Sequence, residues 1–225
     1  MKSRKSWKIE QGLLLVLWAA VAGFLLLMVI AAWPQYWRFI AAETTPLAWL
    51  ESVLLVLTGA VTGSIAVVEA MIGRRRKVIM GWIIVSAAFA WLSLDERFAL
   101  HERIRDRFLK PTGIKLLPWM EAGDWLIPLY AVCGLAAVWS IWRLIGVHNG
   151  ARIFLIVGLI IAACAVGMDT IDIRSLDKGA ERLLQSIEEG LETVAMTSFL
   201  SAFLCVWMKR IRELTSEARN EPSNG

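Results

Sequence analysis

Histidine and cysteine are scarce in this sequence. The 225 residues include 2 His and 3 Cys. So few cysteines exclude a disulfide-stabilised scaffold, and two histidines exclude a His-rich zinc site. Polar sequence is limited as well, because 57% of the residues are hydrophobic, whereas soluble domains contain about 45–50%. The composition therefore excludes an ordinary soluble domain and favours a membrane protein.

Six apolar segments are long enough to cross a bilayer, which takes roughly 20 mainly apolar residues. We predict an all-α, polytopic integral membrane bundle of about six transmembrane helices, which forms one domain over residues 1–212. The polar residues 213–225 are predicted to be a disordered cytoplasmic tail. The six segments are residues 12–33, 47–73, 78–94, 125–142, 153–168 and 187–208.

Basic residues concentrate on one side of this bundle. With six spans and the N-terminus inside, the run Arg74-Arg75-Arg76-Lys77 and the basic residues flanking both termini share the cytoplasmic side. Because Lys and Arg in cytoplasmic loops set orientation, the pattern predicts an N-in, C-in protein of the cell inner (plasma) membrane. The net charge of +4 is then explained by the membrane, and we predict the lipid bilayer, not nucleic acid, as a partner.

Acidic residues gather on the opposite, outer side, at the ends of five predicted helices. Residues three, four or seven positions apart share a helix face, so several of these carboxylates can point inward together. A carboxylate within the membrane costs several kcal/mol unless it is paired, and we therefore expect a cation, bound protons or arginines to compensate. The candidate cluster, which includes one histidine, is Glu51, Asp95, His101, Glu102, Asp169, Asp172, Glu188, Glu189 and Glu192.

Two segments beside this cluster are amphipathic. In residues 97–110, Leu100, Ile104 and Phe108 recur every four residues between charges, which is typical of an interfacial helix. We predict that this segment extends the third helix outward, which would place Asp95 and Glu102 on one face. Residues 174–186 are predicted to form a similar short helix before the sixth span.

A purely structural interpretation of the acids stays open beside the functional one. Acids at helix N-termini complement the helix dipole, and the arginines of the outer loops could pair with the remainder. On the inner side, Glu69 is expected to pair with the neighbouring arginines. Gly59-x-x-x-Gly63 in the second span predicts close helix packing.

Three functions compete for the outer cluster. The leading hypothesis is a cation site that acts on a lipid or another membrane-associated substrate. Its oxygen-rich ligands suit Ca²⁺, Mg²⁺ or Mn²⁺, while a single imidazole admits Fe²⁺ and makes Zn²⁺ a poorer match. The alternatives are a proton- or ion-coupled transporter, and a non-catalytic scaffold whose acidic cap binds a periplasmic or membrane protein. The sequence leaves open whether any reaction is catalysed.

Overall fold

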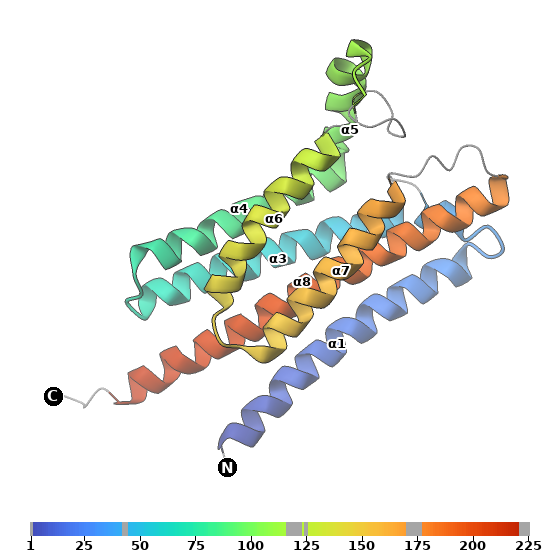
Figure 1. Cartoon of the computed structure of the whole chain (residues 1–225). Helices are drawn as coiled ribbons and strands as arrows, with labels where there is room; N and C mark the ends of the chain where they lie inside the picture. The colour runs from blue at the N-terminus through green and yellow to red at the C-terminus, as the bar shows by residue number, and fades with distance from the viewer. Residues whose placement is uncertain (1, 42–44, 116–122, 124–125, 170–176, 221–225) are drawn as a thin grey trace.

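The computed structural model describes residues 2–41, 45–115, 123, 126–169 and 177–220. Every regular element within these ranges is a helix, which confirms the predicted all-α class (Figure 1). In chain order the helices are α1 (Lys2–Ala31), α2 (Trp37–Ile40), α3 (Pro46–Met71), α4 (Arg76–Phe98), α5 (Leu100–Ile104), the π-helical turn η1 (Arg105–Leu109), the 3₁₀ turn η2 (Lys110–Thr112), α6 (Leu126–Ile145), α7 (Asn149–Asp169) and α8 (Lys178–Asn220).

Five helices in the described part of the chain are long and apolar enough to cross a membrane. These candidate spans lie within α1, α3, α4, α7 and α8. They correspond to five of the six segments predicted from hydropathy. The remaining segment corresponds to α6, in which a shorter apolar stretch, Val132–Ile145, is found. A sixth crossing therefore stays a prediction.

Helix α3 begins where its sequence provides a cap. Thr45 precedes the helix, and its side-chain oxygen accepts a hydrogen bond from the Ala48 amide at 3.4 Å. Pro46 occupies the first helical position, where its missing N–H costs nothing. This start fixes the depth of Glu51, which follows about one turn later.

The centre of the bundle is formed by α3, α4, α7 and α8. Helix α3 packs extensively on α4 and on α8, and α7 packs on α8, while α1 lies along one side (Figure 1). Trp82 and Phe89 of α4 meet Phe203 of α8 in edge-to-face contacts, with ring centroids 5.9 and 5.6 Å apart. This apolar core fixes α4 and α8 on either side of α3.

Glycines bring α3 and α4 unusually close together. The Ser86 hydroxyl of α4 donates to the Gly59 carbonyl of α3 at 2.8 Å. A Cβ atom on Gly59 would lie 3.3 Å from the Ser86 carbonyl oxygen, and one on Gly63 would lie 3.1 Å from the Ser86 hydroxyl. The small-residue motif therefore packs two helices together, as predicted.

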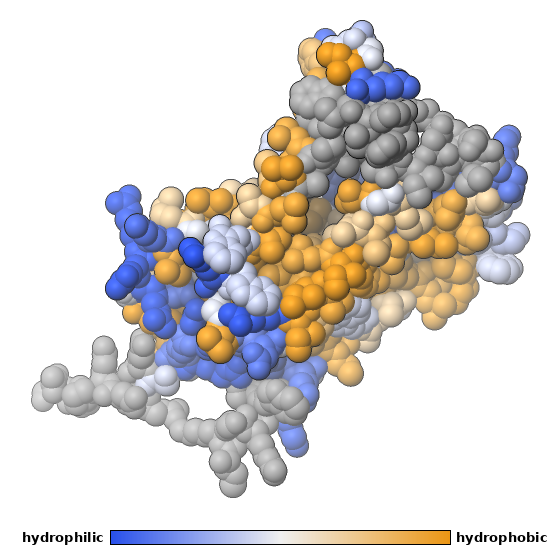
Figure 2. All heavy atoms as spheres, viewed as in Figure 1, coloured by the Kyte–Doolittle hydropathy of each residue, from blue (hydrophilic) through white to orange (hydrophobic). Residues whose placement is uncertain are grey.

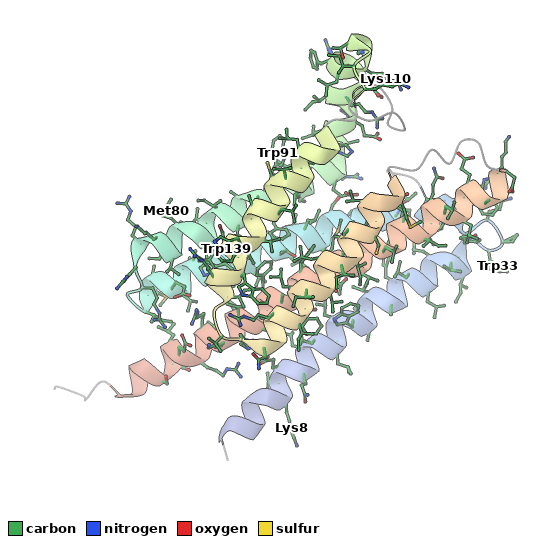
Figure 3. All side chains as sticks on the ribbon, in the orientation of Figure 1. Lys8, Trp33, Met80, Trp91, Lys110 and Trp139 are labelled. Carbon is green, nitrogen blue, oxygen red and sulfur yellow. The ribbon has the colours of Figure 1, made fainter. Side chains whose placement is uncertain are left out.

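The two ends of the bundle differ in charge. We call "basic end" the one that holds both termini, the turn at residues 72–75 and the turn at 146–148, and Figure 2 shows hydrophilic residues gathered there beside an apolar flank. The opposite end, at which α3 and α8 begin and α4 ends, is called the acidic end. Lys8 and Lys110 mark the two ends in Figure 3.

The predicted outward extension of the third helix is wrong. Helix α4 ends at Phe98, and Ala99 adopts a left-handed conformation with φ 47°. The chain then continues through the short elements α5, η1 and η2. A continuing helix would pair the His101 amide with the backbone one turn earlier, but this N–H instead donates to the Asp95 side chain at 2.7 Å. A side-chain acceptor thus competes with the helix and redirects the chain.

Helix α8 is longer than the predicted sixth span. It runs for 43 residues from Lys178 to Asn220. Residues 178–186, predicted as a separate interfacial helix, are its first turns, and the helix continues past Glu213, where the polar tail was expected to begin. Hydropathy marks only the apolar middle, because the charged flanks, rich in Leu, Glu, Arg and Lys, are equally good helix formers.

Candidate functional site

Glu51 of α3 is fully buried at the acidic end. Its Oε1 atom accepts a hydrogen bond from the Thr193 hydroxyl of α8 at 2.7 Å. The same hydroxyl lies 3.0 Å from the Glu189 carbonyl oxygen, one turn earlier in α8. The other carboxyl oxygen of Glu51, Oε2, is also buried and has no hydrogen-bond partner. Glu51 is therefore a buried acid with half of its carboxyl group unsatisfied.

Three further carboxyl groups surround Glu51. The charges that act on it most strongly come from Glu189, Glu96 and Glu192. Glu96 and Glu189 lie within side-chain hydrogen-bonding reach of Glu51, so a protonated Glu51 carboxyl group can donate to either of them. We call Glu51, Glu96, Glu189 and Glu192 the acid cluster. Within the described chain, no Lys or Arg forms an ion pair with Glu51, Glu96 or Glu189.

Asp95 and His101 form a second polar group beside the acid cluster. The Asp95 carboxylate accepts from the backbone N–H of His101 and lies 3.1 Å from the imidazole Nδ1 atom. Tyr130 of α6 interacts with the same carboxylate, and its ring lies edge-on to the imidazole. Asp95 thus fixes the orientation of His101, as carboxylates do for catalytic and metal-binding histidines. The charge of His101 also reaches Glu96, which joins this pair to the acid cluster.

The structure brings together some of the predicted site residues and separates others. Glu51, Glu189 and Glu192 meet in the acid cluster, Glu188 adjoins it through Glu189, and Asp95 and His101 form the neighbouring pair. Glu102 instead pairs with Arg105 three residues later, at 3.4 Å. Asp172 and the side chain of Asp169 lie outside the described residues.

Three residues of this region were not among the predicted site residues. Glu96 had a visible signal, because it follows Asp95 directly, but the predicted continuation of α4 favoured Glu102. Thr193 is four residues after Glu189 and therefore shares its helix face, but it carries no charge that would set it apart in the sequence. Tyr130 has no local signal, since its approach to Asp95 depends on how α6 packs on α4.

The buried acid at the basic end is neutralised, in contrast to Glu51. Glu69 of α3 is fully buried, and its carboxylate lies 2.7 Å from the Arg210 Nε atom and 3.6 Å from the Arg74 Nε atom. Glu213 bridges the same two arginines at 2.8 and 3.4 Å. The expected pairing of Glu69 with a neighbouring arginine is confirmed, and Arg210 of α8 is added to it. Helix α3 therefore buries two glutamates, and among the described residues arginines face Glu69 but not Glu51.

Glu10 is also paired at the basic end. Its carboxylate lies 2.9 Å from Arg212 and 3.9 Å from the His148 imidazole. The Ala151 amide donates to Nδ1 of His148 at 3.1 Å, which requires that this nitrogen carry no proton. Burial lowers the pKa of His148 below its ordinary value, Glu10 opposes that shift, and Lys209 and Arg212 add to it. His148 is therefore held in its neutral form.

Acidification is expected to destabilise the basic end through His148. The unfolded chain protonates this residue near its ordinary pKa of about 6.5, whereas the folded chain does so only at lower pH. The unfolded state thus binds more protons in that window, and stability falls as pH drops through it. Thermal unfolding between about pH 7.5 and about pH 5.5 should show a steeper loss for wild type than for His148→Asn. Equal slopes for the two proteins would contradict this assignment.

No group of three or more His, Cys, Asp or Glu is arranged to hold a metal ion among the residues that the structure describes. The acid cluster nevertheless supplies only oxygen donors, which suit hard cations and protons equally. What its members share is a carboxyl group that acts electrostatically on the buried Glu51 or belongs to it.

One family model matches most of this chain, over residues 13–207. The family is described as Domain of unknown function (DUF8692). The matched region includes the acid cluster, the Asp95–His101 pair and Glu69. No curated protein and no solved structure matches the chain.

Proposed function

We propose that this chain, which belongs to the DUF8692 family, is a multi-pass protein of the cell inner membrane that binds a cation at the acid cluster. In this proposal the chain crosses the membrane six times with both termini in the cytoplasm, and the acid cluster faces outward. The basic run at residues 74–77 supports this orientation, because basic residues are retained on the cytoplasmic side.

The observation that carries the proposal is the charge around Glu51. Several ionised carboxylates cannot share one buried site, because desolvation and mutual repulsion both oppose their charges. Glu69, on the same helix, shows how this protein neutralises a buried acid with arginine, and Glu51 has no such partner in the described residues. We infer that a bound ion, or protons on the carboxyl groups, supply the positive charge that Glu51 lacks among the described residues.

The bound cation is either a metal ion or a proton, and two measurements distinguish them. Metal content of the gently purified protein, after exposure to Ca²⁺, Mg²⁺, Mn²⁺ and Fe²⁺, reports a bound metal. The infrared C=O band of a protonated carboxylic acid, measured at neutral pH, reports a bound proton. We expect one of these signals in wild type and its loss in Glu51→Gln, which keeps an oxygen for Thr193 but removes the charge.

Glu102→Gln is the matched control. This glutamate lies near the same end, yet its partner is Arg105, so its substitution should leave both signals unchanged. A wild-type protein with neither a stoichiometric metal nor a protonated carboxyl would overturn the proposal and leave a scaffold with an acidic cap. If a metal is found, assays with lipids that carry hydrolysable headgroups are the next measurement, since the site would lie near the headgroup layer.

A further inference from the structure

One face of α3 carries a line of buried polar side chains. At 100° per residue, Thr58, Thr62 and Glu69 lie within about 20° of the direction of Glu51. All four side chains are fully buried. The line begins in the acid cluster and ends at the ion pair of the basic end.

Helix α8 runs beside this line in the same direction and in nearly constant register. Thr193 contacts Glu51, and Arg210 contacts Glu69. The sequence separation between the two partners differs by only one residue from the first contact to the second. Between them α3 rises by about 27 Å, close to the roughly 30 Å thickness of the hydrocarbon core. The two buried glutamates therefore lie near opposite membrane boundaries.

Hydroxyl groups occupy the interval between the two glutamates. In this register, the fully buried Thr197 of α8 lies between the levels of Glu51 and Thr58. Thr58, Thr62 and Thr197 each donate to a carbonyl one turn back in their own helix, at 2.7 to 2.9 Å. Each hydroxyl oxygen keeps lone pairs that can accept a proton. We call Glu51, Thr193, Thr197, Thr58, Thr62 and Glu69 the polar seam.

A general need for polar side chains in the core does not explain this pattern, because other helices bury few of them. The buried side chains of α7 in the described structure are apolar, and the polar residues that α4 buries there apart from Trp82, namely Ser93 and Asp95, lie at its acidic end. Polar burial along the whole membrane depth is therefore concentrated where α3 meets α8. In the interval between the two buried glutamates, the fully buried and apolar Ile65 occupies the last helical turn before Glu69.

We propose that the polar seam is a route by which protons cross the bundle between the acid cluster and Glu69. This inference rests on the proposed cation site and names the proton as the cation that moves. A carboxyl group of the cluster releases a proton, each hydroxyl accepts one proton and passes on its own, and the Glu69 carboxylate accepts the last. The axial steps from Glu51 to Thr62, about 4.5 to 6 Å, match one intervening water molecule each, whereas the last step, from Thr62 past Ile65 to Glu69, is about 10.5 Å and requires more than one.

The burial of the seam favours protons over metal ions. Fully buried threonines leave no lumen for a hydrated ion, whereas proton exchange requires only that hydroxyls rotate and transiently hydrate. Ile65 and the Glu69–Arg210 ion pair close the basic end, so transfer requires that Arg210 move away from Glu69. Conduction is therefore expected to be slow and driven by membrane potential or a proton gradient.

The test uses the full chain reconstituted into liposomes that contain a pH-sensitive dye. A potassium gradient with valinomycin supplies the driving force, and the initial rate of proton uptake is measured. Wild type is expected to exceed protein-free vesicles. Thr58→Val and Thr62→Val keep the side-chain shape and should lower the rate about tenfold, the factor that corresponds to one lost hydrogen-bonded step. Ser64→Ala is the matched control, since its hydroxyl lies on the exposed side of α3.

Each outcome decides for or against the route. Thermal unfolding must be unchanged in the threonine variants, so that a lower rate reflects the hydroxyls and not the fold. Wild-type vesicles that take up protons no faster than empty ones, or threonine variants that match wild type, would overturn the route and leave the hydroxyls with a packing role. If a cation is bound at Glu51 but no flux occurs, the cation site stands and only the route fails. Without either signal both proposals fail.

Discussion

Replacing Arg210 with methionine is expected to reduce the free energy of unfolding by about 3–5 kcal/mol. The substitution removes the nearer of the two arginines that neutralise Glu69, and the buried carboxylate cannot recover the lost interaction from water. Arg74 remains, but it lies 3.6 Å away and is half exposed. Thermal unfolding in detergent, followed by circular dichroism, measures the effect.

A double variant separates the effect of the buried charge on stability from the effect of lost packing. Because an isolated buried charge is what destabilises the single variant, Glu69→Leu together with Arg210→Met should restore most of the lost stability. Arg74→Met serves as a milder comparison, since its side chain faces solvent. An Arg210→Met protein as stable as wild type would show that Glu69 is not held by this ion pair.

Glu51→Gln is expected to change stability in the opposite direction from Glu69→Gln. In cation-free protein, the Glu51 substitution removes one acid from a group of like charges and keeps an oxygen that can accept from Thr193. We expect the free energy of unfolding to increase by about 0.5–2 kcal/mol, as is usual when an unfavourable arrangement that serves function is removed. Glu69→Gln removes a charge that two arginines stabilise, and should lower the melting temperature.

This increase in stability should disappear when the cation is present at a concentration that fills the acid cluster of the wild-type protein. A cation that binds only the folded protein stabilises it by mass action, and Glu51→Gln has lost that contribution. Comparing the melting temperatures of the two proteins with and without the identified cation measures the difference. Equal responses to the cation would place its binding site away from Glu51, and a destabilised Glu51→Gln protein would mean that the carboxylate has a positive partner.

The sequence predicted the helices well where hydropathy alone decides. The second and third spans, predicted at 47–73 and 78–94, correspond to α3 at Pro46–Met71 and α4 at Arg76–Phe98. Their ends coincide with strong local signals, such as Pro46 and the basic residues at 74–77. Helix α8 was predicted too short because a charged helical flank and a charged loop have the same hydropathy.

The candidate site was predicted in part, for an equally physical reason. Depth along a helix is readable from sequence, and it singled out Glu51 and Glu192, of which the structure buries Glu51 fully. The direction of the chain after Asp95 was not readable, because the break at Ala99 involves neither glycine nor proline. It depends on the Asp95 carboxylate, in place of a backbone carbonyl, accepting the hydrogen bond of the His101 amide.

The length of α8 has a mechanical consequence. Its 43 residues extend about 64 Å, whereas a bilayer with its headgroups is about 45 Å thick. In the proposed topology, one covalently continuous rod reaches aqueous solution on both sides, with Glu189 near one surface and Arg210 near the other. A tilt or rotation imposed at either surface is delivered to the opposite one directly, without passing through a loop that could absorb it.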